Sequence, residues 1–242
     1  MSAEPAREPA ASFVARLDAL LDRHAPELRG RISTADDDGL DLPRLAEPAV
    51  AERALAGFRR RYPCGEPRAV ASLFVQWYAA TAWPSLVVAL IVLNRLPSPA
   101  TTALRLDELG TPVGVIVKDH VASTTVAAGL EELIRGHAAA LVANAAGAAR
   151  LSPRVPWSNV SNVLGWTLEQ LQSRAPDYRL DEARALLARR RFDDGAPNPL
   201  WIAEPGAWRA KGRPPRRTCC LRYRLDAVPY CGDCPVPEKR RT

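Results

Sequence analysis

The sequence predicts a mainly α-helical protein with one small β-hairpin, an α+β fold. Three observations lead to this prediction. First, 47% of the 242 residues are hydrophobic, enough to bury a substantial core. Second, only 6% of the residues are aromatic, which argues against an all-β sandwich. Third, apolar residues recur at helical spacing along most of the chain, and 22 prolines divide it into segments.

The first third of the chain is predicted to hold two amphipathic helices. Apolar residues at helical spacing over 13–21 indicate a helix that ends near Pro26. A second helix begins at Pro48, because proline is well tolerated in a first helical turn. The acidic run 36–39 between the two helices is predicted as a loop, and Cys64 is predicted to lie in a turn.

Residues 69–94 carry no charged side chain, and a stretch of this length raises the question of a membrane span. Val70, Phe74 and Trp77 follow helical spacing. Pro84 is expected to split the stretch into two pieces that are each too short to cross a bilayer. We therefore interpret it as a buried helical pair, with contact to a membrane surface as the alternative.

Strict alternation of apolar residues predicts the β-hairpin, in which residues 103–106 and 113–118 flank a turn at 107–110. Helical spacing returns at 130–149. Residues 151–156 are expected to break that helix.

Two further helices are predicted before the chain becomes irregular. One covers 160–171 with Ser158 or Asn159 as its N-cap, and a short one covers 181–192. Residues 193–217 contain five prolines and three glycines, which predicts a long irregular connection.

The positive charge is concentrated at the C-terminus. The chain carries 33 Lys and Arg against 27 Asp and Glu, a net charge of +6. Residues 209–242 hold ten basic and three acidic residues, a balance of +7, so that residues 1–208 carry −1. We therefore divide the chain into a helical scaffold with a substrate-binding surface, 1–208, and a basic segment, 209–242, that packs on the scaffold and is not an independent domain. The segment is predicted to meet an acidic partner or to offset a negative charge of its own.

The first 11 residues contain two glutamates and no apolar core of a secretory signal, so we expect a cytoplasmic protein. In that reducing compartment a dense group of cysteines is more often a metal site than a disulfide framework. Four of the five cysteines lie in the basic segment.

These four cysteines, Cys219, Cys220, Cys231 and Cys234, follow the pattern C-C-x10-C-x2-C. The C-x2-C half brings two sulfurs to one metal in zinc ribbons and in iron-sulfur proteins alike. The adjacent pair, Cys219 and Cys220, distinguishes a zinc site from an iron-sulfur cluster. Neighbouring side chains point in different directions, so such a pair is poorly placed to bind a single tetrahedral ion. A two-iron cluster offers separate ligand directions. The spacing thus favours a cluster, with structural zinc or reducible disulfides as the alternative.

The segment resembles the C-terminal signature of the FhuF-type ferric siderophore reductase family. Besides the cysteines, the basic run before Cys219, the Leu-Arg-Tyr-Arg-Leu of 221–225 and the Cys-Gly-Asp-Cys-Pro of 231–235 are similar to that family, and Trp157-Ser158-Asn159 resembles its W-x-N segment. The cysteine motif covers about 16 residues, and the similarity upstream concerns length and helix order. The resemblance implies that the four cysteines hold a 2Fe-2S cluster, with no catalytic residue beyond it.

The implied activity is one-electron reduction of siderophore-bound iron(III) to iron(II), which releases the iron. Hydroxamate and catecholate oxygens are hard donors that hold iron(III) tightly, and reduction weakens their hold. The implied partners are a ferric siderophore and an acidic electron donor such as a ferredoxin or flavodoxin. No nucleic acid is expected. The resemblance places the protein in the cytoplasm or at the inner face of the membrane, where peripheral contact stays open.

Several residues near the motif are candidates for a role around the cluster. We hypothesise that Arg217, Arg222 and Arg224 tune its potential and attract the ferric complex or the donor, against the alternative that they keep the segment soluble. Trp157 and Asn159 are candidates for framing the substrate, although a core anchor and a helix cap are the favoured interpretation.

Two tryptophans, the three histidines and Cys64 are the remaining residues of a type that occurs in functional sites. Trp201 and Trp208 are candidates for packing over the cluster. His137 is predicted to be a core histidine, and neither Cys64, His24 nor His120 is assigned to a metal.

Two other functions fit the same features. The basic tail with Tyr223 and Tyr230 also suits a zinc-stabilised nucleic-acid-binding protein. The cluster motif also suits an iron-sulfur electron carrier or sensor without siderophore activity. Nothing in the sequence matches a Walker loop or a dinucleotide-binding glycine pattern.

Overall fold

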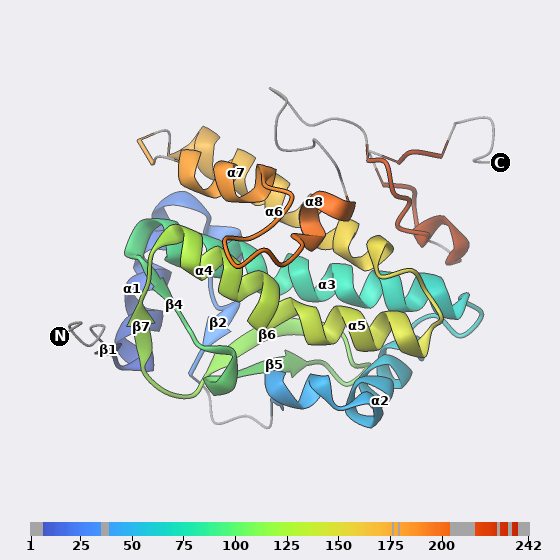
Figure 1. Ribbon diagram of the computed structural model, residues 1–242. Coiled ribbons are helices and arrows are strands. Elements are labelled where there is room, and N and C mark those ends of the chain that lie inside the picture. Colours follow the sequence, from blue (N-terminus) through green and yellow to red (C-terminus); the bar gives the residue numbers. More distant parts are fainter. Residues whose placement is uncertain are drawn as a thin grey trace.

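The computed structural model describes residues 7–34, 39–175, 177–178, 180–203, 216–226, 228–231 and 234–236. Helices dominate it and strands are few, as the sequence predicts (Figure 1). One long helix, α3 (Pro67–Val88), runs through the middle, with the main sheet on one side and helix α6 (Arg154–Arg174) on the other. The contact between α3 and α6 is the most extensive one between two helices among the described residues.

α3 is a single helix, so the prediction of a helical pair split at Pro84 is wrong. The helix passes through Pro84 and continues as a π-helical turn, Ala89–Leu93. A proline inside a helix removes one backbone hydrogen bond and costs about 3 kcal/mol. Here Pro84 is buried together with Trp83 and Ser85, and we attribute its tolerance to the packing around it.

The uncharged stretch belongs to the core of the protein. Among the described residues one helix, Pro67–Leu93, is long and apolar enough to cross a membrane, but 78% of its most apolar window is buried inside the protein. The interpretation of this stretch as core is therefore confirmed, although its division into two pieces is not.

α6 begins six residues earlier than predicted. Its first residue is Arg154 and its N-cap is Pro153, so neither Ser158 nor Asn159 caps the helix. The prolines at 153 and 156 do not break the helix, because residues at its start have no intrahelical bond to lose. Ser158 and Asn159 consequently lie inside α6, each with 0% of its surface exposed.

The predicted hairpin is confirmed. Strand β5 (Thr102–Leu106) pairs antiparallel with β6 (Pro112–Val117), and Asp107 closes the turn by accepting hydrogen bonds from the amides of Leu109 and Thr111. Gly110 has φ +75°, a left-handed conformation that glycine adopts without strain.

The hairpin forms part of a larger sheet that was not predicted. Its strand order is β2-β6-β5-β3, with β2 (Ile32–Ser33) parallel to β6 and β3 (Leu40–Asp41) antiparallel to β5. A second sheet has the order β1-β7-β4, from Arg7–Glu8, Val121–Ser123 and Arg95–Leu96. These additional strands have two or three residues each, too few for alternation to be visible in the sequence.

The remaining helices surround α3 (Figure 1). They are α1 (Ala10–His24), α2 (Pro48–Arg59), α4 (Val126–Glu132), a π-helical segment (Leu133–Ala138), α5 (Ala139–Ala148), α7 (Asp181–Ala188) and α8 (Pro199–Ala203). Short 3-10 turns lie at Pro26–Leu28, Leu42–Ala46, Pro99–Thr101 and Arg222–Arg224.

These bounds confirm α1 and α2 and correct two other predictions. The short helix that starts at Asp181 ends at Ala188 and not at 192. α8 lies within the connection that was predicted to be irregular. Residues 36–38 of the predicted acidic loop lie outside the described residues.

The core contains one buried histidine, as predicted. His137 is 3% exposed, and its Nε2 lies 3.0 Å from the carbonyl oxygen of Pro97. Tyr78, fully buried on α3, donates a hydrogen bond of 2.9 Å to the carbonyl of His137. Burial lowers the pKa of His137 to about 4, so the imidazole is neutral at pH 7.

Candidate iron-sulfur centre

The described part of the basic segment packs against the first turns of α3 and α6 (Figure 1). Ser72 of α3 donates a hydrogen bond of 2.7 Å from its Oγ to the carbonyl oxygen of Cys220. Leu225 is 3% exposed and belongs to the core. Arg224 forms an ion pair with Glu66, the residue before α3. The predicted boundary at 208–209 lies outside the described residues.

The four cysteines of the motif differ in burial, and none of them forms a disulfide within the described part of the chain. Cys220 is 1% exposed, whereas Cys219, Cys231 and Cys234 are half-buried. The sulfurs of Cys220 and Cys231 lie 3.7 Å apart. Cys219 lies close enough to Cys220 and Cys234 for both to act on its pKa. In the described part of the chain no three Cys, His, Asp or Glu side chains converge on one point as a metal site.

The 3.7 Å separation suits two thiolates that share one metal. Two sulfurs at tetrahedral angles with metal–sulfur bonds of about 2.3 Å are about 3.8 Å apart. A single structural zinc would need four sulfurs at that mutual distance. In a two-iron cluster each iron is held by two thiolates, so one close pair is compatible with such a cluster.

Backbone amides of a strained turn point at the adjacent cysteines. Leu221 has φ +63°, a left-handed conformation that is uncommon for a residue with a side chain. Its amide donates to Sγ of Cys219 at 3.4 Å. The amide of Arg222 contributes to lowering the pKa of Cys220. Such strain, of the order of 1–3 kcal/mol, is typical of functional sites, and amide–sulfur hydrogen bonds raise the potential of iron-sulfur centres.

The two adjacent thiols have opposite pKa shifts. The hydrogen bond with Cys231 lowers the pKa of the Cys220 thiol, and the positive charges of Arg216 and Arg222 act in the same direction. Burial raises the pKa of Cys219, and the positive charge of Arg216 partly opposes this increase. Cys220 is therefore the thiol of this pair that is more readily deprotonated, and metal ligation requires the thiolate form.

A buried polar network joins the cysteine segment to the scaffold. Arg216 is 5% exposed, and its Nη2 donates to Ser158 Oγ at 3.0 Å and to Asn159 Oδ1 at 2.6 Å. Asn159 Nδ2 in turn donates to the carbonyl and to the hydroxyl of Ser72, both at 2.9 Å. The network therefore runs from Arg216 through α6 and α3 to the backbone of Cys220.

Sequence reasoning missed Arg216 and Ser72. A basic residue in a basic run is normally solvated, and a serine within an apolar helix has no distinctive spacing. The one signal for Arg216 is its position at the start of the cysteine motif, three residues before Cys219.

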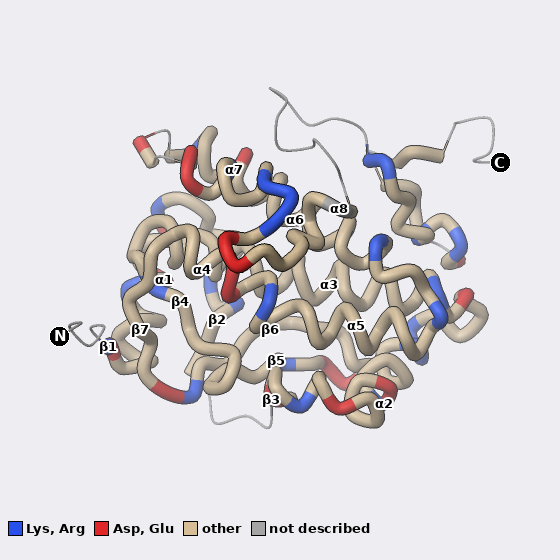
Figure 2. The backbone as a smooth tube through the Cα atoms, viewed as in Figure 1, with Lys and Arg blue, Asp and Glu red and all other residues tan. Residues whose placement is uncertain are grey.

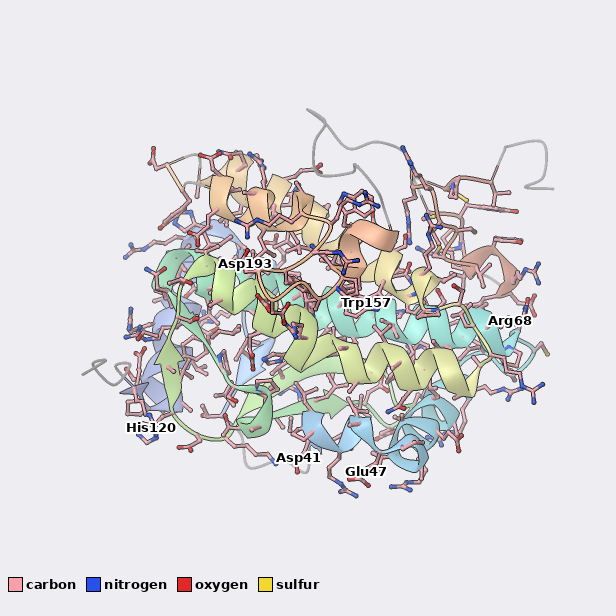
Figure 3. All side chains as sticks on the ribbon, in the orientation of Figure 1. Asp41, Glu47, Arg68, His120, Trp157 and Asp193 are labelled. Atoms are coloured by element: carbon pink, nitrogen blue, oxygen red, sulfur yellow. The ribbon has the colours of Figure 1, made fainter. Side chains whose placement is uncertain are left out.

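The other predicted residues lie in different environments. Trp157 is 9% exposed and packs in the core (Figure 3), and Asn159 is fully buried in the network. Both side chains are buried, and the interpretation of Asn159 as a helix cap is wrong because the N-cap of α6 is Pro153. Trp201 packs beneath the guanidinium of Arg190, 4.7 Å from its ring centre, and Trp208 lies outside the described residues.

The three predicted arginines lie at or near the surface. Arg217 and Arg224 are exposed and Arg222 is half-buried. With three exposed arginines near the starts of α3 and α6 they form what we call the basic surface (Figure 2): Arg68, Arg150, Arg154, Arg217, Arg222 and Arg224. Arg68 lies at the start of α3 (Figure 3).

The remaining candidates form no second site among the described residues. Cys64 is exposed and lies in the turn after α2, as predicted. His120 is exposed and pairs with its neighbour Asp119. Tyr223 and Tyr230 stack on each other, with ring centres 5.8 Å apart.

A helical scaffold that anchors a C-terminal segment with four cysteines, none in a disulfide among the described residues and two with sulfurs 3.7 Å apart, is typical of an iron-sulfur protein of the oxidoreductase class. The family described as ferric iron reductase FhuF-like transporter matches residues 72–209, more than half of the chain. The FhuF 2Fe-2S C-terminal domain matches residues 216–235. The chain belongs to this ferric iron reductase family, and its cofactor is a 2Fe-2S cluster.

A curated relative agrees with this assignment. The ferric siderophore reductase of Escherichia coli (strain K12) is 27% identical over 210 residues, which cover 81% of this chain and 79% of the relative. The resemblance inferred from the cysteine motif is thus confirmed, together with the mainly helical fold.

Proposed function

We propose that this protein reduces siderophore-bound iron(III) to iron(II) by passing on single electrons, so that the siderophore releases its iron. The observation that carries the proposal is the four-cysteine segment, anchored to the scaffold by Ser72 and Arg216 and matched by the family's 2Fe-2S domain. The name of the bacterial relative supports a siderophore complex as the substrate. No bond of the siderophore has to break, because iron(II) is held more weakly by hard oxygen donors.

Cys219, Cys220, Cys231 and Cys234 are the proposed ligands of the cluster. The cluster, when bound, supplies a centre that accepts and donates one electron. The protein holds Cys220 in the interior and Cys219, Cys231 and Cys234 near the surface. Such a position suits electron transfer to a substrate too large to enter the fold.

The basic surface is the proposed docking area for the substrate and the electron donor. Three of its six arginines belong to the cysteine segment itself, and positive charge attracts anionic ferric complexes and acidic donors such as a ferredoxin or flavodoxin. We propose a cytoplasmic location. The apolar helix that prompted the membrane alternative is mostly buried inside the protein.

Anaerobic reduction followed by a challenge with ferric complexes tests the proposal. We expect the visible spectrum to bleach on reduction, and ferric hydroxamates or catecholates to restore it as iron(II) appears. The gallium(III) complexes of the same siderophores are the matched control, because gallium(III) resembles iron(III) but accepts no electron. Failure of every ferric complex to reoxidise the protein would refute the proposal and favour an electron carrier or sensor.

A further inference from the structure

Arg216 is a buried charge whose described partners are all neutral. It is 5% exposed, and its two hydrogen bonds go to a serine hydroxyl and an asparagine oxygen. Its Nε and Nη1 are buried and have no hydrogen-bond partner among the described residues. Within the described part of the chain no Asp or Glu pairs with it. A buried guanidinium normally has a carboxylate or phosphate partner, so this arrangement lacks a negative charge.

The cysteine segment provides such a charge when the cluster is bound. Two iron(III) ions, two sulfides and four thiolates carry a net negative charge, and one added electron makes it larger. Arg216 lies three residues before Cys219 and acts electrostatically on both Cys219 and Cys220. A positive charge fixed beside such a group stabilises its reduced state more than its oxidised state.

We propose that Arg216 is the fixed counter-charge of the cluster and sets its reduction potential, and that Ser158 and Asn159 hold it in place. This inference rests on the proposed cysteine ligation. Of the three arginines that the sequence indicated for tuning, the half-buried Arg222 also acts on Cys220, whereas the other two are exposed. Arg217 and Arg224 are exposed, so water and salt screen their charges, whereas a charge buried beside Ser158 and Asn159 is screened far less.

The decisive measurement is an anaerobic redox titration of the loaded full chain with mediators and no siderophore, at low and at high salt. We expect Arg216→Gln to shift the reduction equilibrium at least tenfold toward the oxidised state, which is about 59 mV for one electron. This shift should persist at high salt. The matched control, Arg217→Gln, removes an exposed neighbouring charge and should shift the equilibrium less than threefold, with loss of the effect at high salt.

Thermal unfolding of the full chain without cluster separates a counter-charge from a merely structural role. If the charge of Arg216 is uncompensated in the cluster-free protein, Arg216→Gln leaves that protein as stable as wild type or makes it more stable, because the substitution removes an uncompensated buried charge. If Arg216 serves only the packing of α6 against the segment, the same variant lowers the melting temperature and leaves the potential unchanged. The second result overturns the inference.

Arg216→Lys decides the question if the glutamine variant does not retain a cluster. Lysine keeps the charge but loses the planar hydrogen bonds to Ser158 and Asn159. An equilibrium within threefold of wild type supports the counter-charge, and a tenfold shift refutes it. Because the titration contains no ferric complex, its result is independent of whether the wild-type protein reduces siderophore iron. A protein whose potential follows Arg216 but which reduces no ferric complex would refute the proposed function alone.

Discussion

Replacing Ser72 by alanine is expected to loosen the cysteine segment from the scaffold. Ser72 is fully buried on α3, where its hydroxyl donates to the carbonyl of Cys220 at 2.7 Å and accepts from Asn159 at 2.9 Å. Each bond contributes about 1 kcal/mol net, and the Cys220 carbonyl is left buried without this donor at a cost of about 1–3 kcal/mol. Asn159 keeps the carbonyl of Ser72 as an acceptor. We therefore expect a loss of about 2–3 kcal/mol.

Two measurements check this magnitude. The free energy of unfolding from urea titration reports it if the segment unfolds together with the scaffold. The rate at which a chelator removes the cluster reports it if the segment opens by itself. With one factor of ten for each 1.36 kcal/mol, chelation should become about 30- to 150-fold faster.

Ser173→Ala is the matched control, because the hydroxyl of Ser173 also donates to a backbone carbonyl but lies at the exposed end of α6. It should change both quantities by less than about 0.5 kcal/mol. Should Ser72→Ala behave like Ser173→Ala in both assays, the hydrogen bond to Cys220 would not anchor the segment.

Three further predictions concern the ligands, the core and the basic surface. Replacement of any one of Cys219, Cys220, Cys231 or Cys234 by serine should abolish or alter the visible spectrum and lower the bound iron and sulfide. Cys64→Ser should leave the spectrum and the iron and sulfide content unchanged, because Cys64 is exposed and lies apart from the motif. Equal loss in all five variants would contradict the ligand set. His137 has a folded-state pKa of about 4 against an ordinary 6.5, so its contribution to stability is complete above about pH 6.5 and is lost as the pH falls toward 4. The loss of about 2.5 kcal/mol between pH 7 and pH 4.5 should be absent in His137→Gln and present in the control His120→Gln, as urea titrations at the two pH values would show. The same pH dependence in both variants would refute it. The combined replacement of Arg217, Arg222 and Arg224 by alanine should raise KM for an anionic ferric complex at low salt and leave it nearly unchanged at high salt; an effect that is independent of salt would exclude electrostatic attraction.

Local pattern was enough to predict the elements in which neighbouring residues carry the signal. The stripe of apolar residues in α1, Pro48 at the start of α2 and the alternation in β5 and β6 each lie within one element. The prediction failed where the outcome depends on distant residues. Pro84 continues the helix among buried neighbours, and strands β2 and β3 exist because the hairpin offers them edges to pair with.

For the candidate site, the spacing of Cys219, Cys220, Cys231 and Cys234 favoured an iron-sulfur cluster, because ligand chemistry depends on residue type and on short separations along the chain. The family was indicated by the resemblance of the whole motif and its flanking residues. The tertiary structure decided which charge lies beside the thiols. Arg216 and Arg217 are adjacent in the chain, yet one is buried against Ser158 and Asn159 and the other is exposed. Burial depends on where α3 and α6 meet the segment, so only the folded chain distinguishes an arginine that can set a potential from one that water screens.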